Sequence, residues 1–391
     1  MLVTYFEVKL EPITVKYEEE ATFTETYGFV GSQGVVVLEG IYFIPKEKKS
    51  ETIVLMMHPS STLQQLPIPM VLAESGVHVL CCASRYPKND SALIMEKVLL
   101  DLGAYIRFVK EELGYKKVVL LGWSGGGSLA LFYQSQAEKP TITHTPANDE
   151  VNLLKAKLIP ADGLMFIAAH ISRALVLTEW MDPSVLDEVN PDIREKALDI
   201  YDRENVNQPP FSADFLREYR LAQITRNKKI TLWVKNKLEE LKFRNDGQLE
   251  MGFVVHRTMA DPRWIDPSVD PNDRKPNWCY LGEPRAVNNG PAGLARFCTL
   301  RSWLSQWSLE YSRADGELSA KQISVPFLAI ENSADDACPA GHTERIYMAA
   351  GSNDKEMKVV KGAGHYYKNQ PEKLEKAVSF ISEWLQVRNF S

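Results

Sequence analysis

The sequence is poor in several features that define common classes of protein. Its 391 residues include only five cysteines, and neither a C-x-x-C nor an H-E-x-x-H pattern occurs. A disulfide framework is therefore not indicated, and neither is a metal site. No apolar run approaches the roughly 18 residues that a membrane span requires. Cys81 and Cys82 lie inside an apolar strand pattern and are better explained as small buried hydrophobic residues, and the other three cysteines are scattered along the chain.

Positively charged side chains are also fewer than negatively charged ones. The formal net charge is −6 at pH 7, whereas a nucleic-acid surface needs a basic stripe. The first residues, MLVTYFEVKLEP, lack the basic segment and apolar stretch of a secretory signal. We therefore expect a cytoplasmic protein that binds a small molecule and neither nucleic acid nor a membrane. No metal or organic cofactor is expected, and a homo-oligomer is compatible with the sequence.

Short apolar runs alternate with helical patterns over most of the chain, after an N-terminal β segment (1–45). The predicted strands are 52–57, 77–82, 118–121, 163–168, 326–330 and 357–360, and the predicted helices are 64–75, 92–113, 128–139, 340–350 and 371–387. Such alternation predicts an α/β protein with a mostly parallel sheet covered by helices on both faces.

Between about residues 172 and 323 the alternation stops. Amphipathic helical patterns cover 211–243 and 294–311, and a turn-rich run, DPRWIDPSVDPNDRKPN, separates them. Six of the eight tryptophans fall in this region. We predict a core domain of residues 1–172 and 323–391, with a helical cap (173–322) inserted before the strand at 326–330.

The segment KKVVLLGWSGGG carries the main chemical signal. Residues 118–121 form a buried strand pattern, Gly122 to Gly126 fit G-x-S-x-G, and a helix pattern follows at 128–139. In this setting a strained turn exposes the hydroxyl of Ser124 at the top of the sheet. The alternative is an ordinary glycine-rich loop. A phosphate-binding loop is disfavoured because the lysine of G-x-x-x-x-G-K-[ST] is missing.

A serine hydroxyl needs a base to take its proton, and the base needs an orienting acid. Asp335 follows the strand at 326–330, and His365 follows the strand at 357–360. The order Ser, Asp, His with each residue at a strand end predicts that His365 is the general base and that Asp335 orients it. Asp336 is the alternative acid, although a solvated turn position also explains it.

Stabilising the developing negative charge requires two N–H donors. The amide of Gly125, directly after the nucleophile, is the first. The second should come from the loop after the strand at 52–57, which contains His58, Pro59, Ser60 and Ser61. Proline has no N–H, so we predict Ser60 as the donor, with Ser61 as the alternative. We assign His58 a loop-positioning role and no proton transfer.

Together these motifs resemble the α/β-hydrolase superfamily over all of the chain except the cap. GWSGGG resembles its nucleophile elbow, NSADDACP its acid turn and GAGH its histidine loop. The resemblance implies the α/β-hydrolase fold and a catalytic triad of Ser124, Asp335 and His365. One departure is the His58-Pro59 pair, where many members have His-Gly.

The resemblance implies a serine hydrolase that cleaves a carboxylic ester through an acyl-enzyme on Ser124. Hydrolysis of a carbon–carbon bond, thioester, lactone or amide, and acyl transfer, use the same triad and stay open. The alternative outside the enzymes is a non-catalytic binding protein with the same fold. Epoxide hydrolysis and dehalogenation are disfavoured because those members carry a carboxylate in place of Ser124.

The aromatic residues of the cap favour a mostly apolar or aromatic substrate. Trp123, Trp303 and Trp307 are candidate substrate contacts, although a tryptophan stripe also serves helix packing. Arg85 and Tyr86 follow the strand at 77–82 and are further candidates, with a solvated loop as the alternative.

Overall fold

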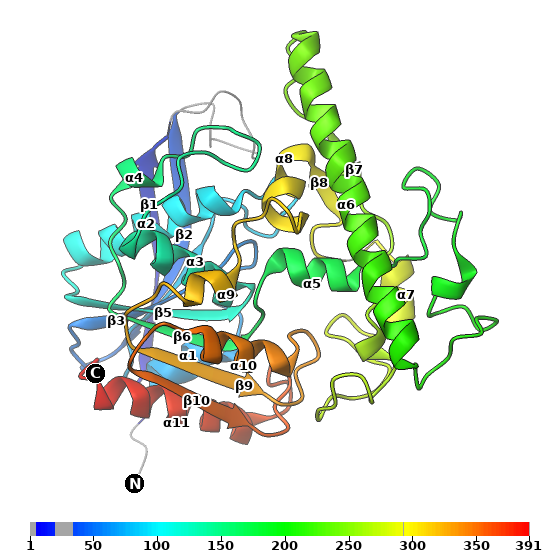
Figure 1. Cartoon of the computed structure of the whole chain (residues 1–391). Coiled ribbons are helices and arrows are strands. Elements are labelled where there is room, and N and C mark those ends of the chain that lie inside the picture. Colours follow the sequence, from blue (N-terminus) through cyan, green and yellow to red (C-terminus); the bar gives the residue numbers. More distant parts are fainter. Residues whose placement is uncertain (1–4, 20–33, 292, 391) are drawn as a thin grey trace.

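The computed structural model describes residues 5–19, 34–291 and 293–390, and its main feature is an eight-stranded sheet (Figure 1). The strands follow the order β1-β2-β4-β3-β5-β6-β9-β10. Their bounds are β1 (Val8–Glu18), β2 (Val35–Pro45), β3 (Thr52–His58), β4 (Val79–Ala83), β5 (Lys117–Ser124), β6 (Gly163–Ala169), β9 (Phe327–Asn332) and β10 (Lys355–Val360). The predicted strands are confirmed, and part of the predicted N-terminal β segment (1–4 and 20–33) lies outside the described residues.

The sheet is mostly parallel. β1 pairs with β2 and β2 with β4 in antiparallel fashion, whereas every pair from β4 to β10 is parallel. The strands β3, β5, β6, β9 and β10 therefore all end at the same edge of the sheet. In parallel sheets of this kind, this edge is where ligands bind.

Helices cover both faces of the sheet because the central strands are apolar on both sides. Ile53 and Leu55 of β3 belong to the apolar cluster under α2, α3 and α10, while Val54 and Met56 belong to the cluster under α1 and α11. The helices are α1 (Pro67–Glu74), α2 (Met95–Glu111), α3 (Gly125–Glu138), α4 (Leu153–Ala156), α10 (Ala340–Ala349) and α11 (Pro371–Val387). Burial on both faces explains why the strands could be recognised from continuous apolar runs.

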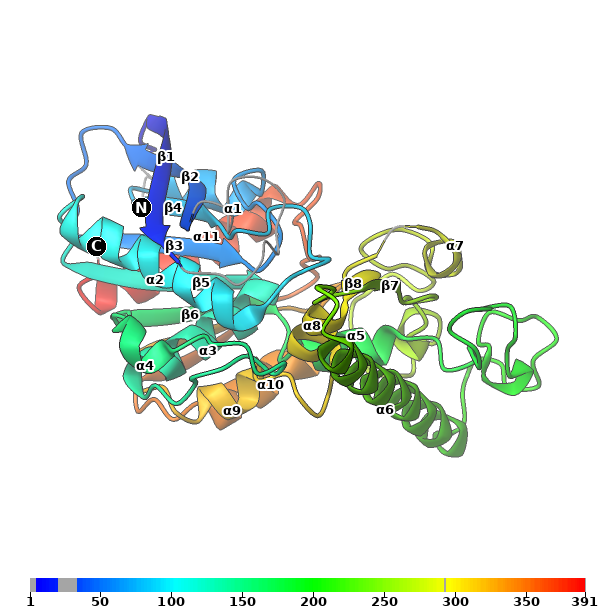
Figure 2. The same ribbon diagram turned by 90° about the horizontal axis from the view of Figure 1, so that it is seen from above.

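The region predicted as a cap adds no strand to the large sheet, and most of it lies to one side of the sheet (Figure 2). Its elements are α5 (Arg173–Trp180), η1 (Lys196–Leu198), α6 (Ala213–Arg244), β7 (Gly252–Val254), η2 (Pro262–Trp264), α7 (Pro284–Asn289), β8 (Phe297–Thr299), α8 (Leu300–Ser302), the π-helix η3 (Trp303–Trp307) and α9 (Gly316–Ala320). The 32-residue helix α6 extends away from the rest of the molecule. Ala314 and Ala320, near the end of this region, pack into the apolar cluster of α2 and α3.

The helical pattern predicted at 294–311 is only partly correct. Phe297 to Thr299 form β8, which pairs with β7, and helical structure begins only after Thr299. The Thr299 side chain accepts a hydrogen bond from the Ser302 amide, and the Ser302 hydroxyl accepts one from the Thr299 amide. This reciprocal cap fixes the start of the helix and so separates the strand from it. In the described part of the chain, no helix is long and apolar enough to cross a membrane.

Candidate active site

Ser124 lies at the turn from β5 into α3 in a strained backbone conformation. Its φ is 56° and its ψ is −128°, in the left-handed region that non-glycine residues seldom adopt. A Cβ atom at Gly122 would lie 2.5 Å from the carbonyl oxygen of Gly126, and one at Gly126 would lie 2.3 Å from that of Met57. Strand and helix approach so closely that only glycine fits at either position. The strand, turn and helix predicted around G-x-S-x-G are present.

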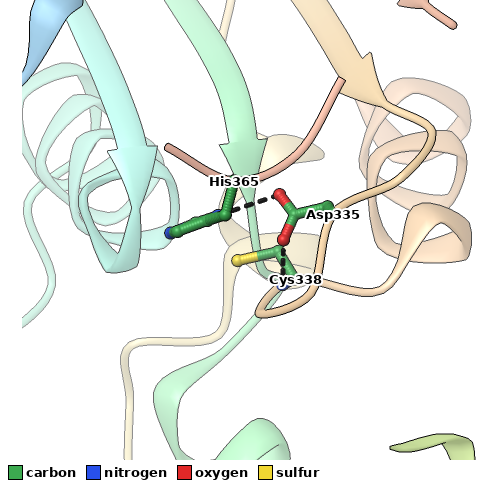
Figure 3. Close-up of side chains that lie close together, drawn as sticks. All are labelled: Asp335, Cys338 and His365. Carbon is green, nitrogen blue, oxygen red and sulfur yellow. Dashed lines mark hydrogen bonds and ion pairs between the residues drawn. The ribbon is translucent and has the colours of Figure 1, made fainter. Parts of the chain in front are cut away.

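Asp335 and His365 form a buried hydrogen-bonded pair next to this turn (Figure 3). Oδ2 of Asp335 lies 2.9 Å from Nδ1 of His365, and each residue is 2% exposed. Oδ1 of Asp335 accepts hydrogen bonds from the amides of Ala337 at 2.8 Å and Cys338 at 2.7 Å. These bonds fix the carboxylate, which in turn fixes the imidazole. The acid that bonds the imidazole of His365 is Asp335.

The hydroxyl of Ser124 faces the thiol of Cys338. Its Oγ lies 4.0 Å from Sγ, and within the described residues it makes no hydrogen bond with His365. Catalytic hydrogen bonds are often long in a free enzyme and tighten when the substrate binds. Cys338 belongs to the NSADDACP turn that carries the acid, but nothing in that motif indicated a contact of its thiol with Ser124.

Asp335, Cys338 and His365 also place ligand atoms within 4.8 Å of one another, a spacing that a metal ion could use. Both oxygens of Asp335 already accept hydrogen bonds, however. Burial raises the pKa of the Cys338 thiol well above its usual value, which disfavours the thiolate that binds metals. The set fits an acid–base pair better than it fits a metal site.

Aromatic side chains surround His365. The Trp123 ring lies 4.4 Å from the imidazole between centroids, and its Nε1 donates to the carbonyl of His365 at 3.3 Å. Tyr366 packs edge-on at 4.8 Å, and Tyr280 from the predicted cap lies 6.5 Å away. Trp123 thus supports the histidine loop, and Tyr280 brings the predicted cap to the edge of the site.

The loop that carries Asp335 is tied to the predicted cap by its backbone. Asp273 donates its amide to the carbonyl of Ser333, and Tyr280 donates its amide to the carbonyl of Asp336, both at 2.9 Å. The Ser333 hydroxyl also donates to the carboxylate of Asp273. Burial, and then the charge of Asp335, raise the pKa of the Asp336 carboxyl.

The loop after β3, which we predicted to supply the second oxyanion donor and call the oxyanion loop (58–61), directs its amides elsewhere. The N–H groups of Ser60 and Ser61 both donate to Nδ1 of His58, at 3.1 and 2.9 Å. Neither amide is therefore free to bind an oxyanion in this conformation. Gly125 remains in place as the first residue of α3, directly after Ser124.

Two residues at this edge were not anticipated from the sequence. His170 directly follows β6 and is 4% exposed, and Arg173 begins α5 and is 2% exposed. Arg173 bonds the carboxylate of Asp90 and, at 2.7 Å, Oε1 of Gln306. Nδ1 of His170 and Nη1 of Arg173 have no hydrogen-bond partner within the described residues. The position of His170 after a strand was the signal that could have identified it.

Two of the three tryptophans proposed as substrate contacts, Trp303 and Trp307, are core residues of the predicted cap. Trp303 and Trp307 are 0% exposed and stack at 5.2 Å. Nε1 of Trp303 donates to Oγ1 of Thr231, and that of Trp307 donates to the carbonyl of Ala295, each at 2.9 Å. Trp303 and Trp307 therefore serve helix packing, which was the alternative to substrate contact.

Arg85 and Tyr86 are also buried, so the solvated-loop alternative is wrong for both. Nε of Arg85 donates to Oδ1 of Asp101 at 3.1 Å, and its guanidinium also pairs with Glu19. Tyr86 is 2% exposed and packs in the apolar cluster that includes α2. Through these contacts Arg85, which follows β4, is joined to α2 and to the N-terminal segment.

Three buried histidines make stability depend on pH. Burial lowers the pKa of His58, His170 and His342 well below the usual value of 6.5. Below pH 6.5 the unfolded chain binds protons that the folded chain does not, so the free energy of unfolding falls as the pH falls. We expect a loss of up to about 4 kcal/mol per pH unit, about 1.4 for each proton.

Urea unfolding between about pH 7.5 and about pH 5 measures this effect. His342→Gln removes one of these protons and should reduce the slope by up to about 1.4 kcal/mol per pH unit. An unfolding free energy that stays constant over this range would contradict the burial of these imidazoles.

Solved structures that are similar to this chain were found by comparing folds, whereas comparisons of sequence found no match. No protein-family model matches the chain, and no curated protein matches it in sequence. A structure of DcsB in complex with its substrate analogue is similar over 97% of this chain and 98% of that one, with 11% identity and a TM-score of 0.52. The esterase domain of a Rhodothermus marinus protein (96% and 98% covered, 12% identity, TM-score 0.46) and an α/β-fold hydrolase of Bacillus anthracis (89% and 96% covered, 16% identity, TM-score 0.41) are also similar.

The chain has the α/β-hydrolase fold, a mixed and mostly parallel eight-stranded sheet with flanking helices, and its likeness to the DcsB structure extends over nearly the whole of both chains. Its structural neighbours include esterases and a lipase. The sequence predicted this fold class correctly.

Proposed function

We propose that the protein is a serine hydrolase that cleaves a carboxylic ester through an acyl-enzyme on Ser124. The observation that carries the proposal is the strained Ser124 at the end of β5, with the buried Asp335–His365 pair at the same edge of the sheet. A hydroxyl on a strained turn and an oriented imidazole are the two parts that nucleophilic acyl transfer requires.

In the first half-reaction Oγ of Ser124 attacks the ester carbonyl carbon, and Nε2 of His365 takes the hydroxyl proton. Asp335 accepts the Nδ1–H of His365, which holds the correct tautomer and stabilises the imidazolium. The carbonyl oxygen becomes an oxyanion, and its collapse expels the alcohol, which receives the proton from His365. Water repeats the sequence on the acyl-enzyme and releases the acid.

A mostly apolar or aromatic substrate is part of the proposal. The rings of Trp123, Tyr280 and Tyr366 lie around His365 and give this edge of the site apolar surface. Apolar walls with a few placed polar groups are typical of small-molecule sites.

A fluorophosphonate that bears a reporter group tests the proposal. The phosphorus accepts Oγ of the active serine, fluoride leaves, and the hydroxyl proton passes to the base. We expect one label for each chain, located on Ser124 by peptide mass spectrometry, and no label on Ser124→Ala.

Ser61→Ala is the matched control, since it removes a nearby hydroxyl and keeps every backbone amide. It should be labelled like the wild-type protein. A label that persists on Ser124→Ala, or a wild-type protein that takes no label, would refute the proposed nucleophile.

A further inference from the structure

His58 holds the oxyanion loop in a way that removes both predicted donors from the reaction. The amides of Ser60 and Ser61 converge on its Nδ1, at 3.1 and 2.9 Å. An N–H that donates to an imidazole nitrogen inside its own loop cannot also bind a substrate oxygen. The oxyanion then needs a second donor besides the amide of Gly125.

The same two hydrogen bonds fix the protonation of His58. A nitrogen that accepts two N–H groups carries no proton, so in the neutral imidazole the proton is on Nε2. The ring is 3% exposed, and burial, followed by the positive charge of Arg173, lowers the pKa of His58 well below 6.5. The imidazole is therefore neutral at pH 7, with Nε2–H as its donor.

Nε2 of His58 lies against the backbone of Gly125. A Cβ atom built on Gly125 would come within 2.7 Å of this nitrogen, and within 3.4 Å of Nε2 of His170. The hydrogen bonds of the His58 ring among the described residues are both to Nδ1, so the N–H of Nε2 is available beside Gly125. Glycine at position 125 leaves room for the ring.

We propose that the Nε2–H of His58 and the N–H of Gly125 together bind the oxyanion formed at Ser124. This inference rests on the proposed function, because it assigns a role in the same reaction. His58 donates a hydrogen bond and transfers no proton. The electron pair of the carbonyl double bond moves to the oxygen, and the proton of Ser124 goes to His365.

Two variants of His58 separate its two ring nitrogens. The side-chain oxygen of His58→Asn can replace Nδ1 as the acceptor for the loop, but the variant has no donor at the place of Nε2. The amide nitrogen of His58→Gln reaches the place of Nε2, whereas the acceptor at Nδ1 is lost. The measurement is the second-order rate of fluorophosphonate labelling at Ser124, because the phosphonyl oxygen uses the same donors.

We expect His58→Asn to react about 100-fold more slowly or worse, and His58→Gln to keep most of the rate. Circular dichroism and thermal unfolding check that both variants are folded. A wild-type rate in His58→Asn, or equal losses in both variants, would overturn the role of Nε2. A wild-type protein that takes no label would instead overturn the proposed function, and the role of His58 with it.

Nuclear magnetic resonance of the wild-type protein with ¹⁵N-labelled histidine tests the role of His58 without any substitution. We expect the proton of His58 on Nε2, with its resonance shifted downfield after phosphonylation of Ser124. A proton on Nδ1, or an Nε2–H resonance that does not respond to the adduct, would refute the proposal.

Discussion

Ser124→Ala is expected to lower kcat for a p-nitrophenyl ester by about 10⁴-fold to 10⁶-fold, with KM changed only a few-fold. The attack on the carbonyl carbon loses its nucleophile, while the surfaces that bind the ester stay in place. Stopped-flow measurement of the burst of p-nitrophenol gives the acylation rate directly, and the burst should disappear in the variant.

Cys338 makes a second variant necessary. Its Sγ lies 4.0 Å from Oγ of Ser124, near enough to act as a substitute nucleophile. Burial raises the pKa of the thiol well above its usual value, so the thiol stays protonated and we expect it to be inactive. Ser124→Ala combined with Cys338→Ala should match the single variant. Residual turnover that only the double variant loses would show that Cys338 can replace the serine.

Asp335→Asn should lower kcat by about 10⁴-fold. The amides of Ala337 and Cys338 hold Oδ1 of this side chain, so the new amide group would turn its Nδ2–H toward Nδ1 of His365. That hydrogen bond puts the imidazole proton on Nε2, where it blocks acceptance of the serine proton. The pH dependence of kcat should then lose the limb that reports the base.

Asp336→Asn is the matched control. The carboxylate that bonds the imidazole of His365 belongs to Asp335. The Asp336 carboxyl lies near the backbone of His365, where an asparagine oxygen can still accept, and its contact with Tyr280 is through its backbone carbonyl, which asparagine keeps. Its kcat should stay within a few-fold of wild type. Equal losses in the two variants would mean that the acid of the pair is misassigned.

The parts of the site that lie at strand ends could be predicted from the sequence. Because β5, β9 and β10 run parallel in one sheet, the residues that follow them, Ser124, Asp335 and His365, had to lie along one edge once the strands were recognised. The choice of Asp335 over Asp336 rested on turn chemistry, and the hydrogen bond to His365 agrees with it.

The parts that depend on contacts between distant segments could not be predicted. The direction of the Ser60 amide follows from the rotamer of His58, which no local pattern encodes. Trp303 and Trp307 share a helical stripe that suits a core as well as a pocket, and only the packing of the 173–322 region decides between them. Arg173 is held at the site by Asp90 and Gln306, which are distant from it in sequence, so no local pattern indicated its position.

Asp273 and Tyr280 form hydrogen bonds with the loop that carries Asp335, so one part of the predicted cap holds the acid in place and the rest does not. Around residues 273–280 the cap is a mechanical support of the acid, so a change of length there would alter the reaction rate even if the substrate pocket were kept. The distal part of α6 extends away from the molecule and carries no such constraint. Attempts to graft a new specificity onto this chain should therefore rebuild the distal part and leave the stretch from 273 to 280 untouched.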